Sequence, residues 1–300
     1  MNESQKYFDP ETLARIGPLG LRARALVEGL VAGLHRSPLR GHSIEFAQHR
    51  EYTPGDDVRQ IDWKVFARSD KVYVKQYEDE TNLLCYLLLD TSQSMTFRGP
   101  VSPLSKLEYA QLIVACLTYL VITQQDSVAV GAFSAQLDAW LPPSSSPSQF
   151  DDMVHVLENS PSNPRTHLGE VIHQFTARVA RPGIVIIVSD LLDDVQRLTS
   201  AWKLLRFQRH DVIVMQVLDA AELDFPFDRT TRFVGLEGLP EVVADARLVA
   251  AAYRTAMAQH CSGLQATCRE LDIDYVQLRT NQSLAKVLPP ILARRRRRRA

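Results

Sequence analysis

Apolar positions along the chain alternate between short strand-like runs and longer stretches with helical spacing. The predicted strands are 83–89, 127–133, 183–188, 212–218 and 273–278. The predicted helices are 104–124, 149–159, 168–179, 196–209 and 242–271, followed by a terminal helix. Apolar strands separated by helices are typical of a parallel sheet covered on both faces. The pattern therefore predicts an α/β fold with a doubly wound, mostly parallel sheet of the Rossmann type.

The first 80 residues differ from the remainder of the chain in their pattern of apolar, polar and charged residues. A helix is predicted at 11–35, where apolar residues recur at helical spacing. From 41 to 80 the sequence is polar, charged and aromatic, with a strand-like alternation at 72–77. A Pro/Ser-rich stretch at 142–148 is predicted to be a loop. We expect three parts: a smaller N-terminal helix-plus-strand segment over 1–80, the α/β domain over 81–293 and an arginine-rich tail over 294–300.

Composition narrows the class of protein. The chain has 300 residues, of which 45% are hydrophobic and 23% charged, as in a soluble globular protein. Its longest apolar run, 112–122, is shorter than the ~20 residues of a membrane span. We therefore predict no membrane span, and the absence of a secretory signal predicts a cytoplasmic protein. Without the six arginines at 294–299, 28 basic residues face 35 acidic ones, so no nucleic-acid partner is expected.

The most informative stretch lies at the end of the strand at 83–89. There an apolar run leads into Asp90-x-Ser92-x-Ser94. While the chain remains extended, alternate residues face one side, so these three side chains can converge. Three oxygen-bearing side chains suit a hard divalent cation that keeps several waters. Because two of the three are neutral hydroxyls, a bound cation would retain positive charge and leave a position open to an outside carboxylate.

Two further residues belong to the same prediction. Asp190 follows the apolar strand at 183–188, and parallel strands bring it to the same sheet edge as Asp90. Thr166 precedes the predicted helix at 168–179 and offers another hydroxyl. Taken singly, each strand-end aspartate is equally well explained as a turn or helix cap, and Thr166 as an N-cap. Together they favour a metal site formed by Asp90, Ser92, Ser94, Thr166 and Asp190, with Mg²⁺ or Mn²⁺ as the ion.

This arrangement, over about residues 83–278, resembles the metal-ion-dependent adhesion site of von Willebrand factor A domains. The resemblance implies that Ser92, Ser94 and Thr166 bind the ion directly or through water. It also implies that Asp90 and Asp190 act mostly through water.

A second resemblance comes from the segment before the sheet. Residues 55–63 read Gly-Asp-Asp-Val-Arg-Gln-Ile-Asp-Trp. They are similar to the G-D-D-x-R-x-I-D-W signature of DUF family fifty-eight (DUF58), proteins with a von Willebrand A-like domain. That resemblance implies a partnership with a MoxR-type AAA+ ATPase. By themselves, Asp56, Asp57 and Asp62 with nearby arginines favour a structural charge network over a binding surface.

The predicted function is a metal-dependent protein–protein interaction module that is not an enzyme. A MoxR-type AAA+ ATPase or a client protein would supply an acidic side chain, in complex assembly or metal-cofactor insertion. A metal-assisted hydrolase of phosphate esters is one alternative, and a scaffold with an empty metal site is another. Gly-rich phosphate loops and His-x-x-x-His pairs are absent from the sequence, which excludes the common nucleotide and zinc-hydrolase sites.

Overall fold

A computed structural model describes residues 18–35, 49–51, 73–75, 83–160, 167–238 and 240–289. The chain divides into two compact units, residues 1–33 with 83–300 and residues 34–82. In the smaller unit, strands β1 (His49–Glu51) and β2 (Tyr73–Lys75) form an antiparallel pair, with His49 opposite Lys75. The strand predicted at 72–77 thus contains β2, whereas the Gly-Asp-Asp signature lies outside the described residues.

The larger unit is built on a six-stranded sheet, which contains the five strands that the sequence pattern predicts for this domain and one more, β5. Its strands in chain order are β3 (Leu84–Asp90), β4 (Ser127–Phe133), β5 (Leu137–Ser144), β6 (Ile184–Ser189), β7 (Asp211–Leu218) and β10 (Asp274–Arg279). In space they follow the order β10-β7-β6-β3-β4-β5. All neighbouring pairs are parallel except β4 with β5. The doubly wound, mostly parallel α/β fold is confirmed.

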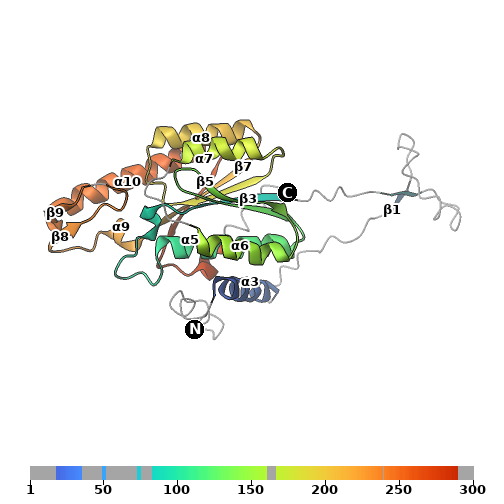
Figure 1. Ribbon diagram of the computed structural model, residues 1–300, viewed down its shortest axis with the longest axis horizontal. Helices are drawn as coiled ribbons and strands as arrows, with labels where there is room; N and C mark the ends of the chain where they lie inside the picture. Colours follow the sequence, from blue (N-terminus) through green and yellow to red (C-terminus); the bar gives the residue numbers. More distant parts are fainter. Residues whose placement is uncertain are drawn as a thin grey trace. The chain divides into compact units, whose positions relative to one another are not determined.

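Helices cover both faces of this sheet (Figure 1). One face carries α5 (Lys106–Thr123) and α6 (Ser148–Asn159), and α3 (Leu19–His35) packs on the outer side of these two helices. The other carries α7 (Leu168–Arg178), α8 (Val195–Phe207) and the last part of α10 (Ala246–Glu270). Because α5 follows β3 and α8 follows β6, the chain leaves these two adjacent strands toward opposite faces. The point where the winding reverses therefore lies between β3 and β6.

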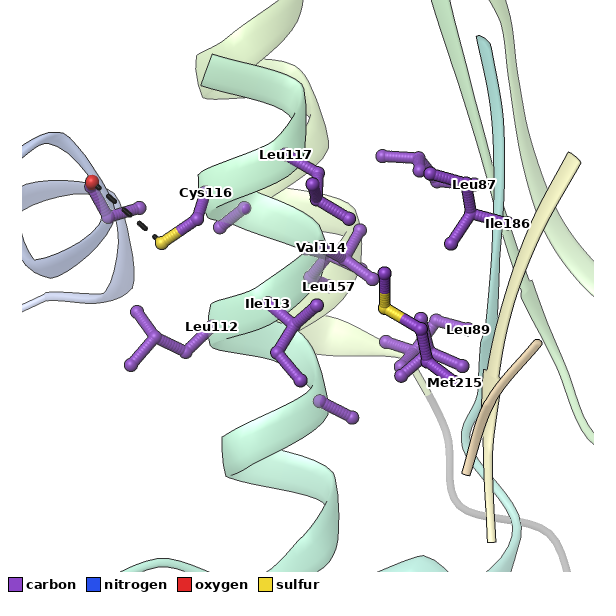
Figure 2. Packing of buried hydrophobic residues seen from close by; sticks show 14 of the residues in the cluster. Leu87, Leu89, Leu112, Ile113, Val114, Cys116, Leu117, Leu157, Ile186 and Met215 are labelled. Carbon is purple, nitrogen blue, oxygen red and sulfur yellow. Dashed lines mark hydrogen bonds between the residues drawn. The ribbon is translucent and has the colours of Figure 1, made fainter. Parts of the chain in front are cut away.

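Helix α5 is the centre of one hydrophobic core. It begins after Ser105, whose side chain accepts a hydrogen bond from the Glu108 N–H at 3.2 Å, a capping box. Val114 and Leu117 point toward the sheet, whereas Cys116 points to α3, where its Sγ lies 3.9 Å from the Ala23 carbonyl oxygen (Figure 2). By length and composition α5 could cross a membrane, yet 61% of it is buried inside the protein. Its apolar run is part of the hydrophobic core, within the helix predicted at 104–124.

Two local predictions were wrong, and two elements were not predicted. The stretch 142–148 was expected to be a loop, but β5 continues through Pro142 and Pro143 to Ser144. Residues 242–245 were expected to be helical, but they form β9 (Val242–Asp245), which pairs with β8 (Thr230–Phe233). The short helix α9 (Ala220–Asp224) and β8 were not predicted. Helix α3 is grouped with the larger unit up to residue 33.

Candidate functional site

The candidate site lies at the carboxyl ends of β3 and β6, where the winding of the sheet reverses. Asp90 is the last residue of β3, and Asp190 follows Ser189, the last residue of β6. In open α/β sheets, this reversal opens a crevice that commonly binds ligands. The structure therefore brings together the two aspartates that the sequence placed on one sheet edge. Both are buried, at 0% and 3% exposed.

The loop after β3 folds around the Asp90 carboxylate. One of its oxygens, Oδ1, accepts a hydrogen bond from the Ser92 N–H at 2.9 Å. The other, Oδ2, accepts one from the Ser189 hydroxyl at 2.6 Å. Ser92 Oγ and Ser94 Oγ lie 3.0 Å apart, on either side of the start of a single 3-10 turn at Gln93–Thr96. Asp90, Ser92 and Ser94 are thus held close together.

The environment of Asp90 changes its acidity. Burial, followed by the charge of Asp190, raises the pKa of Asp90 to about 7, although hydrogen bonds from Ser189 and Ser92 oppose the increase. Two carboxylates in one buried place repel one another, so the pair holds a proton or a cation more tightly than either acid would alone.

Lys106, the first residue of α5, neutralises part of this charge. Its Nζ donates to Asp190 Oδ2 at 2.8 Å and to Glu222 Oε1 at 2.6 Å, and the residue is fully buried. Burial alone would lower the pKa of Lys106, but the charges of Asp190 and Glu222 hold that pKa above its ordinary value. Lys106 therefore stays charged and serves as a built-in counter-ion to Asp190.

A second group of polar side chains continues from Glu222 along the same edge. Glu222 Oε2 accepts from the Asp219 N–H at 2.7 Å, and Asp219 Oδ2 accepts from the Gly99 N–H and the Thr280 hydroxyl, each at 3.0 Å. A β-carbon on Gly99 would lie 2.1 Å from Asp219 Oδ1, so this close approach requires glycine. The network ties the loop after β3 to the ends of β7 and β10.

A cavity of about 70 Å³ opens beside Ser94 and Asp190, and it is large enough for a cation with a few waters. Its polar lining consists of Ser94, Ser189, Asp190, Asp193 and Glu237. Lys106 is not among the lining residues, so its ammonium contacts Asp190 without filling the cavity. A larger cavity of about 430 Å³ lies between α7 and α8, and none of the four predicted site residues that the structure describes lines it.

The donor set fits a small divalent cation in chemistry and spacing. Oxygens bound to Mg²⁺ at right angles lie ~3 Å from each other, and Ser92 Oγ and Ser94 Oγ are 3.0 Å apart. Both are neutral, and Asp190 Oδ1 already accepts from the Leu192 N–H at 3.3 Å. Among the described residues, no group of three His, Cys, Asp or Glu side chains has a metal-holding arrangement. The hydroxyls would therefore be the direct ligands, with the acids behind them.

Of the five predicted site residues, four lie together and one is outside the described residues. Asp90, Ser92, Ser94 and Asp190 share the edge between β3 and β6. The fifth residue, Thr166, lies outside the described residues. Sequence reasoning missed Lys106, Glu222, Asp193 and Glu237. The Ser105 cap preceding Lys106 was a usable signal for the helix start, but nothing in the sequence marks this lysine as buried.

Comparison with known proteins identifies the family. The family described as "Protein of unknown function DUF58" matches residues 48–262, which is more than half of the chain. The chain belongs to the DUF58 family. It is 27% identical to the uncharacterized protein Rv1480 of Mycobacterium tuberculosis over 223 residues, which cover 73% of this chain and 68% of that protein. The DUF58 resemblance stated from the Gly-Asp-Asp signature is thereby confirmed.

Solved structures similar to this DUF58 protein include von Willebrand A-type domains. A conserved hypothetical protein BatB from Bacteroides thetaiotaomicron aligns with a TM-score of 0.44 at 17% identity, over 71% of this chain and 98% of that one. The SpRpn10 VWA domain aligns with a TM-score of 0.41 at 11% identity, over 69% and 93% of the respective chains. The alternation of strands and helices described above defines the fold independently of these likenesses.

Proposed function

We propose that this DUF58 protein is a metal-ion-dependent protein–protein interaction module that turns over no substrate of its own. Ser92, Ser94 and Thr166 would hold Mg²⁺ or Mn²⁺, with Asp90 and Asp190 behind them. The chemistry that the ion supplies is Lewis acidity toward a carboxylate. An aspartate or glutamate of the partner then completes the coordination.

The observation that carries this proposal is the pair of serine hydroxyls 3.0 Å apart at the reversal point of the sheet. They adjoin two buried acids whose mutual repulsion favours a cation. Among the described residues, Lys106 forms ion pairs with both Asp190 and Glu222. A cation bound beside Asp90 and Asp190 would reduce the repulsion between these two acids.

The partner we propose is a MoxR-type AAA+ ATPase or its client protein, met through an acidic side chain in the cytoplasm. We choose this partner because the resemblance of the Gly-Asp-Asp signature to DUF58 proteins implies it. The work of the pair would be complex assembly or metal-cofactor insertion. In this arrangement the ATPase supplies the energy and the DUF58 protein supplies the contact.

A metal-binding experiment tests the site. We expect the wild type to bind Mn²⁺ saturably in an electron paramagnetic resonance titration of the free ion. The double variant Ser92→Ala, Ser94→Ala removes both hydroxyl ligands and should weaken Mn²⁺ binding by at least ~10-fold. Ser262→Ala, on the exposed side of α10, is the matched control and should bind as the wild type does. Equal binding by the double variant contradicts the proposal.

A capture experiment tests the partner. The MoxR-type ATPase of the same organism should be retained on the immobilised protein with Mg²⁺ and released by a chelator. The double serine variant should not retain it, whereas Ser262→Ala should. Retention that neither chelator nor variant affects would remove metal dependence from the function.

One observation favours a second candidate, a docking surface that works without metal. The Lys106 ammonium already occupies Asp190 Oδ2 at 2.8 Å, so part of the acid's charge is balanced within the chain. The partner would then contact the residues around the cavity directly. Chelator-resistant capture combined with the absence of saturable Mn²⁺ binding would favour this candidate over the first.

A further inference from the structure

An insertion between β7 and α10 brings a second chain segment to the candidate site. It begins at Asp219, the N-cap of α9, at the sheet edge where Asp90 and Asp190 lie. It then forms the antiparallel pair of β8 and β9, which extends outward with the start of α10 (Figure 1). Residues 234–241 connect the two strands, and residue 239 is outside the described part.

This insertion is fixed to the fold by aromatic packing. The Phe225 ring lies 4.7 Å from the Tyr253 ring of α10 and 5.7 Å from the Phe233 ring of β8. Helix α10 in turn reaches the loop after β6, where His260 Nε2 lies 2.8 Å from the Leu191 carbonyl oxygen. Helix α10 therefore connects the hairpin to the loop after β6 at the candidate site.

The connection between β8 and β9 places Glu237 at the site cavity. Glu237 is half-buried and lines the 70 Å³ cavity together with Ser94, Ser189 and Asp190. Gly238, with φ of 75°, turns the chain immediately after it. Within the part of the chain that the structure describes, no hydrogen bond or ion pair engages the Glu237 carboxylate. By contrast, Glu241 on the same hairpin pairs with Arg232 at 3.6 Å.

We propose that Glu237 is an internal carboxylate ligand of the candidate metal site, a position that an acidic partner must take over. This inference rests on the proposed function, because it assigns the carboxylate that completes the coordination in the absence of a partner. The hydroxyl-bearing residues Ser94 and Ser189 line the same cavity as Glu237. Binding of a partner would then require the β8–β9 connection to withdraw Glu237, so the chain itself competes for its own site.

Mn²⁺ alone is the probe for this inference. We compare wild type, Glu237→Gln and Glu241→Gln by electron paramagnetic resonance titration and by water-proton relaxation. Loss of the Glu237 carboxylate should weaken Mn²⁺ binding by roughly tenfold. It should also raise the relaxation per bound Mn²⁺, since a water replaces the carboxylate. Glu241→Gln removes the same charge from the same hairpin and should change neither quantity.

Acetate then serves as a probe for the vacated position. It should lower the relaxation of Mn²⁺ bound to Glu237→Gln by displacing that water. The same acetate concentration should leave the wild-type signal unchanged, because Glu237 already fills the position. Equal responses of the two proteins overturn the inference.

The outcomes separate this inference from the proposed function. If the double serine variant loses Mn²⁺ but Glu237→Gln retains wild-type affinity and relaxation, Glu237 is not a ligand and the metal site stands. If the double serine variant binds Mn²⁺ as the wild type does, the site itself is wrong and the inference falls with it. An equal effect of Glu241→Gln would assign the change to hairpin charge and also overturn the inference.

Discussion

Two groups of buried polar residues lie along one edge of the sheet, and they differ in how they are completed. The group at β7 and β10, formed by Asp219, Glu222 and Thr280, finds its partners inside the chain, including Lys106 and the Gly99 N–H. In the group at β3 and β6, formed by Asp90, Ser92 and Ser94, hydrogen bonds within the chain also hold the side chains, but Ser94 lines a cavity.

The difference shows that buried polar side chains of similar chemistry can have two roles, one in positioning the chain and one in binding. A buried polar group whose partners are all internal fixes the position of the strands and loops that contribute to it. A group with oxygens beside a cavity retains the ability to bind something from outside. Asp190 belongs to both, because Lys106 holds one of its oxygens while the residue also lines the cavity. The internal group thus positions the open one.

The largest expected effect comes from removing the cation of the internal group. Lys106→Met leaves Asp190 and Glu222 buried without their common partner. We expect a loss of about 3–5 kcal/mol in the free energy of unfolding, measured by urea denaturation. Lys203→Met, on the exposed side of α8, is the control and should change stability by less than about 0.5 kcal/mol. Equal stability of Lys106→Met and wild type would contradict the counter-ion role.

A pH-dependent effect of intermediate size separates the open group from the internal one. The folded protein holds the Asp90 proton more tightly than the unfolded chain does, since burial raises the pKa of Asp90 to about 7. This stabilising contribution is complete below about pH 4 and is lost as the pH rises through 7. The variant Asp90→Asn has no carboxyl group at this position, so it does not lose stability in this way as the pH rises.

Urea denaturation in metal-free buffer at pH 5 and pH 8.5 measures this effect. Relative to wild type, the stability of Asp90→Asn should increase between these two pH values by about 2–3 kcal/mol. A stability difference that does not change with pH would show that Asp90 does not titrate in this range. Added Mg²⁺ should reduce the difference at pH 8.5, because a cation stabilises the ionised carboxylate of the wild type.

The smallest effect is expected at the far end of the internal group. Thr280→Val removes the hydroxyl that donates to Asp219 Oδ2 and contacts Ser102 Oγ at 2.9 Å. We expect a loss of about 1–2 kcal/mol in urea denaturation, with Mn²⁺ affinity unchanged. The matched variant Thr255→Val lies on the exposed face of α10 and should have less effect. A change in Mn²⁺ affinity for Thr280→Val would mean that the two groups act as one.

The sheet was predictable because its central strands are buried on both faces and therefore consist of consecutive apolar residues. Runs such as 84–90 and 184–189 identify themselves in this way. The strand at 242–245 could not be recognised in this way. Its valines and alanine directly precede a long helix and continue the apolar spacing of that helix. Their pairing with β8 depends on the aromatic packing of Phe225 and Phe233, which is a tertiary contact.

The candidate site was predictable as far as strand ends could reveal it. Asp90 and Asp190 are marked by the apolar strands that precede them, and strand adjacency then brings them together. Lys106 and Glu222 gave no comparable signal, because a lysine or a glutamate in the first turn of a helix is ordinarily solvated. Only the crossing of α5 and α9 at the sheet edge buries them together.

Strand β5 has a consequence for the assembly behaviour of the protein. It is the outermost strand on its side of the sheet, and it contains Pro142 and Pro143. Proline has no N–H to donate, so this border offers an incomplete template to any strand that approaches from another molecule. Pro142 and Pro143, which favoured a loop in the sequence, therefore disfavour edge-to-edge aggregation.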